Sequence, residues 1–102
     1  MRFTVQERDD GAVIALVVFG DVDLATVPDF RAFLSDVCRD GRPVIVDLGG
    51  CTFLDSVGVG LLLGAARRAG AGLTVVGAGG AVRSLLSVTG FDQLVTVRDL
   101  DA

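Results

Sequence analysis

After an opening pair of strand-like segments, short β-branched runs alternate along the chain with segments of helical periodicity. In such an order each helix connects two strands that run in the same direction, through a right-handed crossover. The pattern predicts an α/β fold with a mixed, mostly parallel sheet of about five strands and about three to four helices. The length of 102 residues suits one domain, and we expect that domain to span residues 1–102.

The opening segment predicts a β-hairpin, because an Asp-Gly step at Asp10 and Gly11 separates two apolar stretches. We expect the first helix to begin with Thr26 as its capping residue and to end by Gly41. The strand at 43–48 is of the kind that is buried on both faces of a parallel sheet. The later elements are a helix at 56–69, a strand at 72–76, a helix at 80–90 with Val82, Leu85, Leu86 and Val88 facing inward, and a strand within 91–100.

Composition excludes most enzyme classes, because the chain contains no His, Tyr or Trp. Ser-His-Asp and Cys-His nucleophile arrangements and His-containing metal sites are absent, and two cysteines alone cannot hold a structural zinc ion. The Asp and Glu residues show no metal-ligand spacing. We therefore expect no enzyme activity, no metal and no cofactor. The formal net charge of -4 argues against a nucleic-acid partner.

The sequence also predicts a location. The first ten residues lack the apolar region of a secretory signal. The longest apolar run, 57–66, is about half of the roughly 20 residues that a bilayer span requires. We expect a cytoplasmic protein without direct membrane insertion. Cys38 falls on an expected helix and Cys51 in an expected loop, which predicts free thiols in a reducing compartment and no disulfide.

Two glycine patterns leave alternatives open. The segment GAGGAV at 77–82 follows a strand and opens a helix, but Val82 replaces the small sixth residue of a dinucleotide fingerprint. A tight loop is favoured there over a nucleotide site. Gly60 and Gly64 are four residues apart on one face of a helix. Close packing of that helix on the sheet is favoured over a docking surface for a partner.

Asp55 and Ser56 follow the third strand, at the point where a helix begins. The carboxyl edge of a parallel sheet is where ligands and chemistry usually lie. From the residues alone, a hydroxyl that caps the helix is favoured over a functional hydroxyl at Ser56. Asp21 and Asp23 end the second strand, and they reach the same edge if that strand is the parallel neighbour of the third. The alternative is that both are solvated turn residues.

Three segments together resemble the STAS domain family, and within it the stand-alone anti-sigma factor antagonists of bacteria. GDVDLATVPDFRAFL is similar to the family's acidic segment and first helix, and VIVDLGGCTFLDSVGVGLLLGAARRA to its central strand, Asp-Ser loop and second helix. LTVVGAGGAVRSLLSVTGFDQLVTV resembles its final strand–helix–strand unit. The segments occur in the family's order and fill nearly the whole chain, so the resemblance implies a STAS-like fold.

The resemblance also implies a switch between proteins. In such proteins an anti-sigma factor that is also an ATP-dependent serine kinase phosphorylates the Ser after the loop Asp, which is Ser56 here. The unphosphorylated antagonist binds the anti-sigma factor and frees the sigma factor; phosphorylation ends that binding, and a separate phosphatase restores it. Asp23 and Asp55 occupy the family's acidic positions beside the acceptor. The residues implied to bind the partner, in a monomer that forms hetero-complexes, are Asp21, Asp23, Asp55, Ser56, Val57, Gly58 and Val59.

One residue departs from the family pattern, because Val57 stands where a second Ser or Thr is common. Ser56 and Thr52 are then the hydroxyls of this loop, and phosphorylation at Ser56, at Thr52 or at neither residue is open at this point. Two other functions also remain: a STAS accessory subunit of a membrane transport complex, and a nucleotide-binding regulator.

Overall fold

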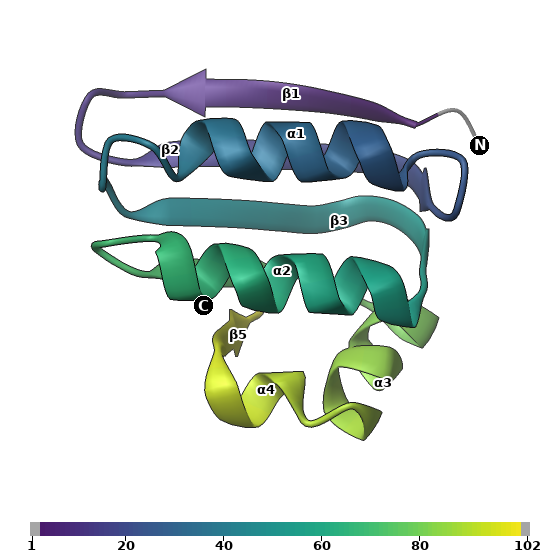
Figure 1. The fold of residues 1–102 in the computed structure, drawn as a ribbon. Helices are drawn as coiled ribbons and strands as arrows, with labels where there is room; N and C mark the ends of the chain where they lie inside the picture. Colours follow the sequence, from purple (N-terminus) through teal and green to yellow (C-terminus); the bar gives the residue numbers. More distant parts are fainter. Residues whose placement is uncertain (1–2, 101–102) are drawn as a thin grey trace.

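Five strands form one sheet in the order β1-β2-β3-β4-β5 in the computed structural model, which describes residues 3–100 (Figure 1). The first two strands pair antiparallel, and every later pair is parallel. The strands are β1 (Thr4–Asp9), β2 (Ile14–Val22), β3 (Val44–Leu54), β4 (Leu73–Val76) and β5 (Thr96–Arg98), and the helices are α1 (Val27–Val37), α2 (Ser56–Arg68), α3 (Gly80–Val88) and α4 (Phe91–Leu94). The predicted mixed α/β fold is confirmed.

The turn of the predicted hairpin is held by side chains of its own residues. The Asp9 carboxylate accepts a hydrogen bond from the backbone N–H of Gly11 at 2.9 Å. The Asp10 carboxylate accepts from the N–H groups of Ala12 at 2.9 Å and Val13 at 2.8 Å. Gly11 has φ of +90°, which only glycine adopts at little cost. These local bonds explain why the Asp-Asp-Gly stretch was sufficient to predict the turn.

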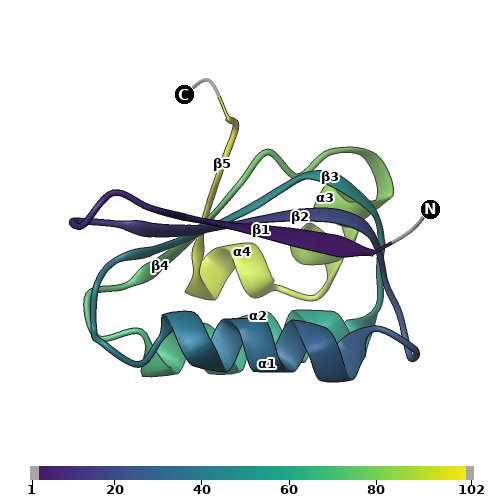
Figure 2. The ribbon, with the colours of Figure 1, turned by 90° about the horizontal axis from the view of Figure 1, so that it is seen from above.

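The helices α1, α2 and α4 lie on one side of the sheet (Figure 2). The burial of the strand residues agrees with this arrangement. In β2, buried and half-buried residues alternate along the whole strand, because successive side chains point to opposite faces of the sheet. In β3 the same alternation begins at Val44, and Ile45 and Asp47 are half-buried. The expectation that this strand is buried on both faces is therefore wrong, since α1 and α2 pack against one face.

The core lies between the helices and the sheet. Its largest fully buried side chains include Phe30, Leu34, Leu62, Leu86 and Phe91, contributed by all four helices. Burying a side chain of this kind stabilises the fold by about 1.5–3 kcal/mol. Within residues 3–100 no helix is long and apolar enough to cross a membrane.

The C-terminal third contains two departures from the predicted elements. Val88 is 84% exposed, although it was expected to face inward. It follows the buried Leu86 by two residues, which places it on the opposite side of a helix with about 3.6 residues per turn. The segment expected to form one strand begins with the short helix α4, whose Phe91 is buried, and only Thr96–Arg98 form β5.

Candidate functional site

The carboxyl ends of β2 and β3 lie side by side. In the parallel register Asp21 is opposite Phe53 and Val22 is opposite Leu54. The next residues along each chain segment, Asp23 and Asp55, therefore leave the sheet at the same edge. This confirms the prediction that the acidic residues of both strands meet at one edge.

Asp55 is the capping residue of α2. It has extended backbone angles, and its Oδ1 accepts a hydrogen bond from the backbone N–H of Gly58 at 2.9 Å. Ser56 is the first helical residue and is exposed. In the part of the chain that the structure describes, no hydrogen bond engages the Ser56 hydroxyl. The interpretation of Ser56 as the cap is therefore wrong, and its hydroxyl belongs to an exposed residue.

Asp23 organises the turn between β2 and α1. Its Oδ1 accepts hydrogen bonds from the N–H groups of Ala25 at 3.0 Å and Thr26 at 3.2 Å, and its own N–H donates to Thr26 Oγ1 at 2.9 Å. The Thr26 hydroxyl donates to the backbone oxygen of Asp21 at 2.8 Å. Thr26 thus stands at the start of α1 but binds the preceding turn, and the expectation that its side chain caps the helix is wrong.

Thr52 differs from Ser56 in its hydrogen bonding. The Thr52 hydroxyl donates to the carboxylate of Asp21 across the pair of strands. Asp21 is half-buried at the end of β2 and, because of this bond, it is more than a solvated turn residue. Of the two hydroxyls that were considered as phosphate acceptors, that of Ser56 is the unengaged one.

The two cysteines are free and buried. Cys51 lies in β3 and not in a loop, and its thiol donates to the backbone oxygen of Phe53 at 3.2 Å. Burial raises the pKa of the Cys51 thiol, and burial likewise raises that of Cys38. Both thiols are therefore poor nucleophiles at neutral pH.

Gly58 is the glycine of α2 that packs against the sheet. A Cβ at this position would lie 2.5 Å from Leu54 Cδ1 and 3.1 Å from Val22 Cγ1. At Gly60 a Cβ would meet no atom within 4 Å, and at Gly64 it would meet only Arg68 Nη1 at 3.4 Å. The favoured explanation of Gly60 and Gly64 by close packing is therefore wrong, and their face of α2 is open.

The predicted partner-binding residues divide into three groups in the structure, and Asp21, Asp23 and Asp55 form the half-buried group. Gly58 and Val59 are buried against the sheet, whereas Ser56 and Val57 present their side chains to solvent. Two exposed apolar residues at the same edge were missed by sequence reasoning, namely Leu24 at 86% exposure and Phe53 at 48%; Val57 is 49% exposed. We name the following residues the carboxyl-edge surface: Asp21, Asp23, Leu24, Phe53, Asp55, Ser56 and Val57.

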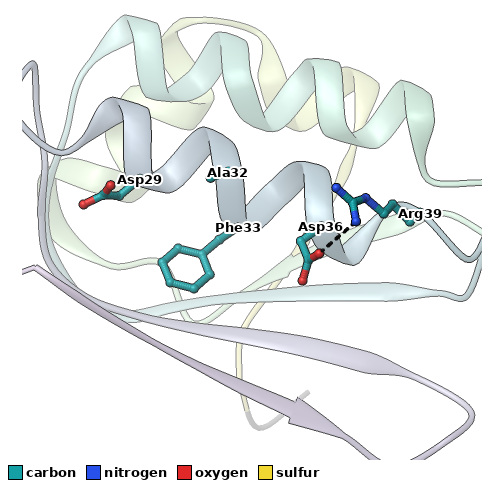
Figure 3. Close-up of a pocket in the computed structure, with 5 residues that line it drawn as sticks. All are labelled: Asp29, Ala32, Phe33, Asp36 and Arg39. Carbon is teal, nitrogen blue, oxygen red and sulfur yellow. Dashed lines mark ion pairs between the residues drawn. The ribbon is translucent and has the colours of Figure 1, made fainter.

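A hollow lies beside α1, on the side of this helix that faces away from α2 (Figure 3). The Phe33 ring extends into it, and Asp36 forms an ion pair of 3.7 Å with Arg39 at one end. The other lining residues are Asp29 and Ala32. The hollow therefore contains none of the residues that were predicted to function.

The GAGGAV loop is shaped by contacts within the chain. Gly77 has φ of +77°, and a Cβ there would lie 3.1 Å from Asp47 Oδ1 and 3.3 Å from the backbone nitrogen of Gly49. These contacts support the interpretation of this segment as a tight loop. Across residues 3–100 there is no group of three or more His, Cys, Asp and Glu residues that could hold a metal ion.

A family model described as Mlab, STAS domain matches residues 5–96. The chain belongs to the STAS domain family. A STAS-domain containing protein of Pseudomonas aeruginosa is 30% identical over 95% of this chain and 99% of its own length. An anti-sigma-B factor antagonist of Staphylococcus aureus is 25% identical over 97% of this chain and 95% of its own length.

Solved structures of anti-sigma factor antagonists share the fold. An anti-sigma factor antagonist from Mycobacterium paratuberculosis is 28% identical, with a TM-score of 0.89 over 95% of this chain and 86% of its own. The anti-sigma factor antagonist SpoIIAA in its unphosphorylated form has a TM-score of 0.69, and the match covers 95% of this chain and 86% of SpoIIAA. SpoIIAA in its phosphorylated form has a TM-score of 0.68, and the match covers 94% of this chain and 90% of SpoIIAA. SpoIIAA is 24% identical, so this likeness shows the fold alone.

Proposed function

We propose that this chain, as a single STAS domain over residues 1–102, is a cytoplasmic anti-sigma factor antagonist. Its unphosphorylated form binds a kinase-type anti-sigma factor and releases the sigma factor, and phosphorylation at Ser56 ends the binding until a phosphatase removes the phosphate. The observation that carries the proposal is the exposed, unengaged hydroxyl of Ser56 beside the Asp55 cap. The relatives named as anti-sigma factor antagonists support the class of protein.

The effect of a phosphate at Ser56 on the free energy of binding has the magnitude that a switch requires. It adds about -1.5 to -2 charges next to Asp55 and near Asp21 and Asp23. Moving a partner from 99:1 bound to 1:99 requires about 5.5 kcal/mol, and like charges brought together in an interface cost several kcal/mol. Because Ser56 is exposed at the N-terminus of α2, the phosphate is tolerated in the free protein.

Ser56 is favoured over Thr52 as the phosphate acceptor. Transfer requires the hydroxyl to leave its present contacts and reach the γ-phosphate of ATP in the kinase. The Thr52 hydroxyl would first have to release the Asp21 carboxylate, whereas the Ser56 hydroxyl has no such bond among the described residues. Val57 in place of a second hydroxyl leaves Ser56 as the one acceptor in the first turn of α2.

A pull-down with four immobilised baits tests the proposal: wild type, Ser56→Ala, Ser56→Glu and Thr52→Ala. Host lysate is passed over each bait, retained proteins are identified by mass spectrometry, and Mg-ATP is then added to map the phosphate. Wild type, Ser56→Ala and Thr52→Ala are expected to retain a serine kinase, and Ser56→Glu to lose it. Phosphate is expected on Ser56 in wild type and in Thr52→Ala.

Other outcomes would point elsewhere. Retention of the kinase by Ser56→Glu, or phosphate on Thr52 alone, would contradict the switch at Ser56. A permease and its ATPase held equally by all four baits would instead favour an accessory subunit of a transport complex. Heat released on titration of ATP or GTP into the free chain would favour a nucleotide-binding regulator.

A further inference from the structure

Two exposed apolar side chains lie at the same edge of the sheet as Ser56, one before α1 and one in α2. Leu24 is 86% exposed in the turn between β2 and α1, and Val57 is 49% exposed in the first turn of α2. The two turns are adjacent, because Val22, two residues before Leu24, lies against Gly58, the residue after Val57. The two side chains therefore leave the protein from neighbouring turns, at the edge of the sheet that carries Ser56.

The turn that carries Leu24 is held rigidly. Asp23 and Thr26 exchange hydrogen bonds on either side of Leu24, and the Thr26 hydroxyl also binds the backbone oxygen of Asp21. An apolar side chain on a fixed turn loses little conformational freedom when a partner covers it, which favours binding. The backbone of Val57 is also held in place, because it lies in the capped first turn of α2.

Charges around the pair indicate the chemistry of the partner. Residues 19–30 and 43–66 contain Asp21, Asp23, Asp29 and Asp55 at the carboxyl edge of the sheet, and neither segment contains an arginine. Four other arginines, Arg39, Arg42, Arg67 and Arg68, follow the C-terminal end of α1 or lie in the last turn of α2. Arg31 is exposed on α1, one residue after the first segment, and Arg83 of α3 pairs with Asp99 at 3.3 Å, so acidic residues remain in excess at this edge. A complementary surface carries Lys or Arg around an apolar centre.

We propose that Leu24 and Val57 form an apolar docking pair that selects the partner and supplies the part of the affinity that does not depend on phosphorylation. The inference rests on the proposed function, and the occupant is the kinase-type anti-sigma factor, through an apolar patch bordered by basic side chains. The docking pair decides which protein binds, and the state of Ser56 decides when. Val57 contributes to the selection of the partner. A protein with a polar group opposite Val57 would bind more weakly, because that group would lose water and find no hydrogen-bond partner.

Matched substitutions test the docking pair. Leu24→Ser and Val57→Ser remove the pair, and Leu94→Ser and Val88→Ser are controls, because Leu94 is 70% exposed and Val88 is 84% exposed on α4 and α3. The probe is the purified serine kinase that wild type retains, titrated by calorimetry against each variant. Each docking-pair variant is expected to weaken Kd about tenfold or more, as for an interface hot spot. The controls are expected to stay within about twofold of wild type.

The outcomes separate this inference from the proposed function. Binding by Leu24→Ser and Val57→Ser within twofold of wild type, while Ser56→Glu loses the kinase, would overturn the docking pair and leave the switch standing. Equal weakening by the two controls would overturn it as well. If wild type retains no serine kinase, both proposals fail together. Val57→Thr keeps the branched shape, and its circular dichroism and Kd show whether any loss at this position reflects the apolar methyl group or a defect in folding.

Discussion

At the residue scale, Asp55 and Ser56 have different roles at the start of α2. The Asp55 carboxylate satisfies the N–H of Gly58, one of the backbone donors that a helix start leaves without an intrahelical partner. Ser56 contributes a helical backbone position and an exposed hydroxyl. The residue that stabilises α2 is therefore not the residue proposed to be modified.

This separation predicts opposite results for two alanine substitutions. Asp55→Ala should lower the free energy of unfolding by about 0.5–2 kcal/mol, since it removes a cap. Ser56→Ala should change it by less than about 0.5 kcal/mol, as expected for an exposed side chain. Urea denaturation measures both, and Asp55→Asn, which keeps a capping oxygen, is the control. A loss at Ser56→Ala as large as that at Asp55→Ala would show that the hydroxyl has a structural role.

The sequence could locate this helix start but not assign the cap. Asp and Ser are both strong capping residues, so the choice between neighbours depends on where the preceding strand ends. The structure extends β3 to Leu54, beyond the β-branched run that predicted it, and this places Asp55 at the junction. The second half of β3 is irregular, because its register with β2 shifts there. This half therefore lacks the alternation of apolar and polar residues by which a strand is predicted.

At the scale of elements, α2 contains glycines of two kinds. Gly58 lies where the helix touches the ends of β2 and β3, and Gly60 lies on the open face. Three consecutive leucines, Leu61 to Leu63, conceal this difference in the sequence, because apolar residues then occur on most sides of the helix. Periodicity could therefore predict the helix but not which glycine faces the sheet.

Alanine substitutions should distinguish the two glycines. Gly58→Ala should lower the free energy of unfolding by about 1–3 kcal/mol, because the added methyl group forces Leu54 and Val22 to move. Gly60→Ala should raise it by about 0.5–1 kcal/mol, since Ala restricts the unfolded chain and the site is empty. Urea midpoints at constant m-value report both changes. Destabilisation by Gly60→Ala would mean that the open face of α2 is occupied.

The short C-terminal elements were the least accessible to prediction. A helix of four residues, such as α4, spans about one turn and therefore has no repeating apolar face in the sequence. Its position follows from tertiary packing, because Gly90 ends α3 with φ of +77° and the adjacent Phe91 is buried in the core. The strand that follows has three residues, which is too short for a clear alternation of apolar and polar residues.

At the scale of the whole molecule, the two ends of the sheet differ in role. At the end opposite Ser56, the Arg42 guanidinium donates to Asp9 beside the hairpin turn, with Nη2 at 3.0 Å from Oδ2, and to Asp40 after α1, with Nε at 3.0 Å from Oδ2. These bonds connect β1 to the loop that leads into β3. They also lower the pKa of the Asp9 and Asp40 carboxyls below their ordinary value of 3.8.

The lowered pKa values predict how this link responds to acid. A carboxyl with a depressed pKa in the folded state stabilises the fold above its unfolded pKa, and this contribution is lost as the pH falls through the folded pKa. The advantage of wild type over Arg42→Gln should therefore be fully present at neutral pH, shrink below about pH 4 and vanish at lower pH. Thermal unfolding of both proteins from pH 7 to pH 2.5 measures it. The two carboxylates are exposed, so the difference in Tm should be small and should decrease with salt. Affinity for the kinase at neutral pH should be equal in the two proteins, because Arg42 is remote from the carboxyl-edge surface; a weaker Kd for Arg42→Gln would show instead that the two ends are coupled through β2 and β3.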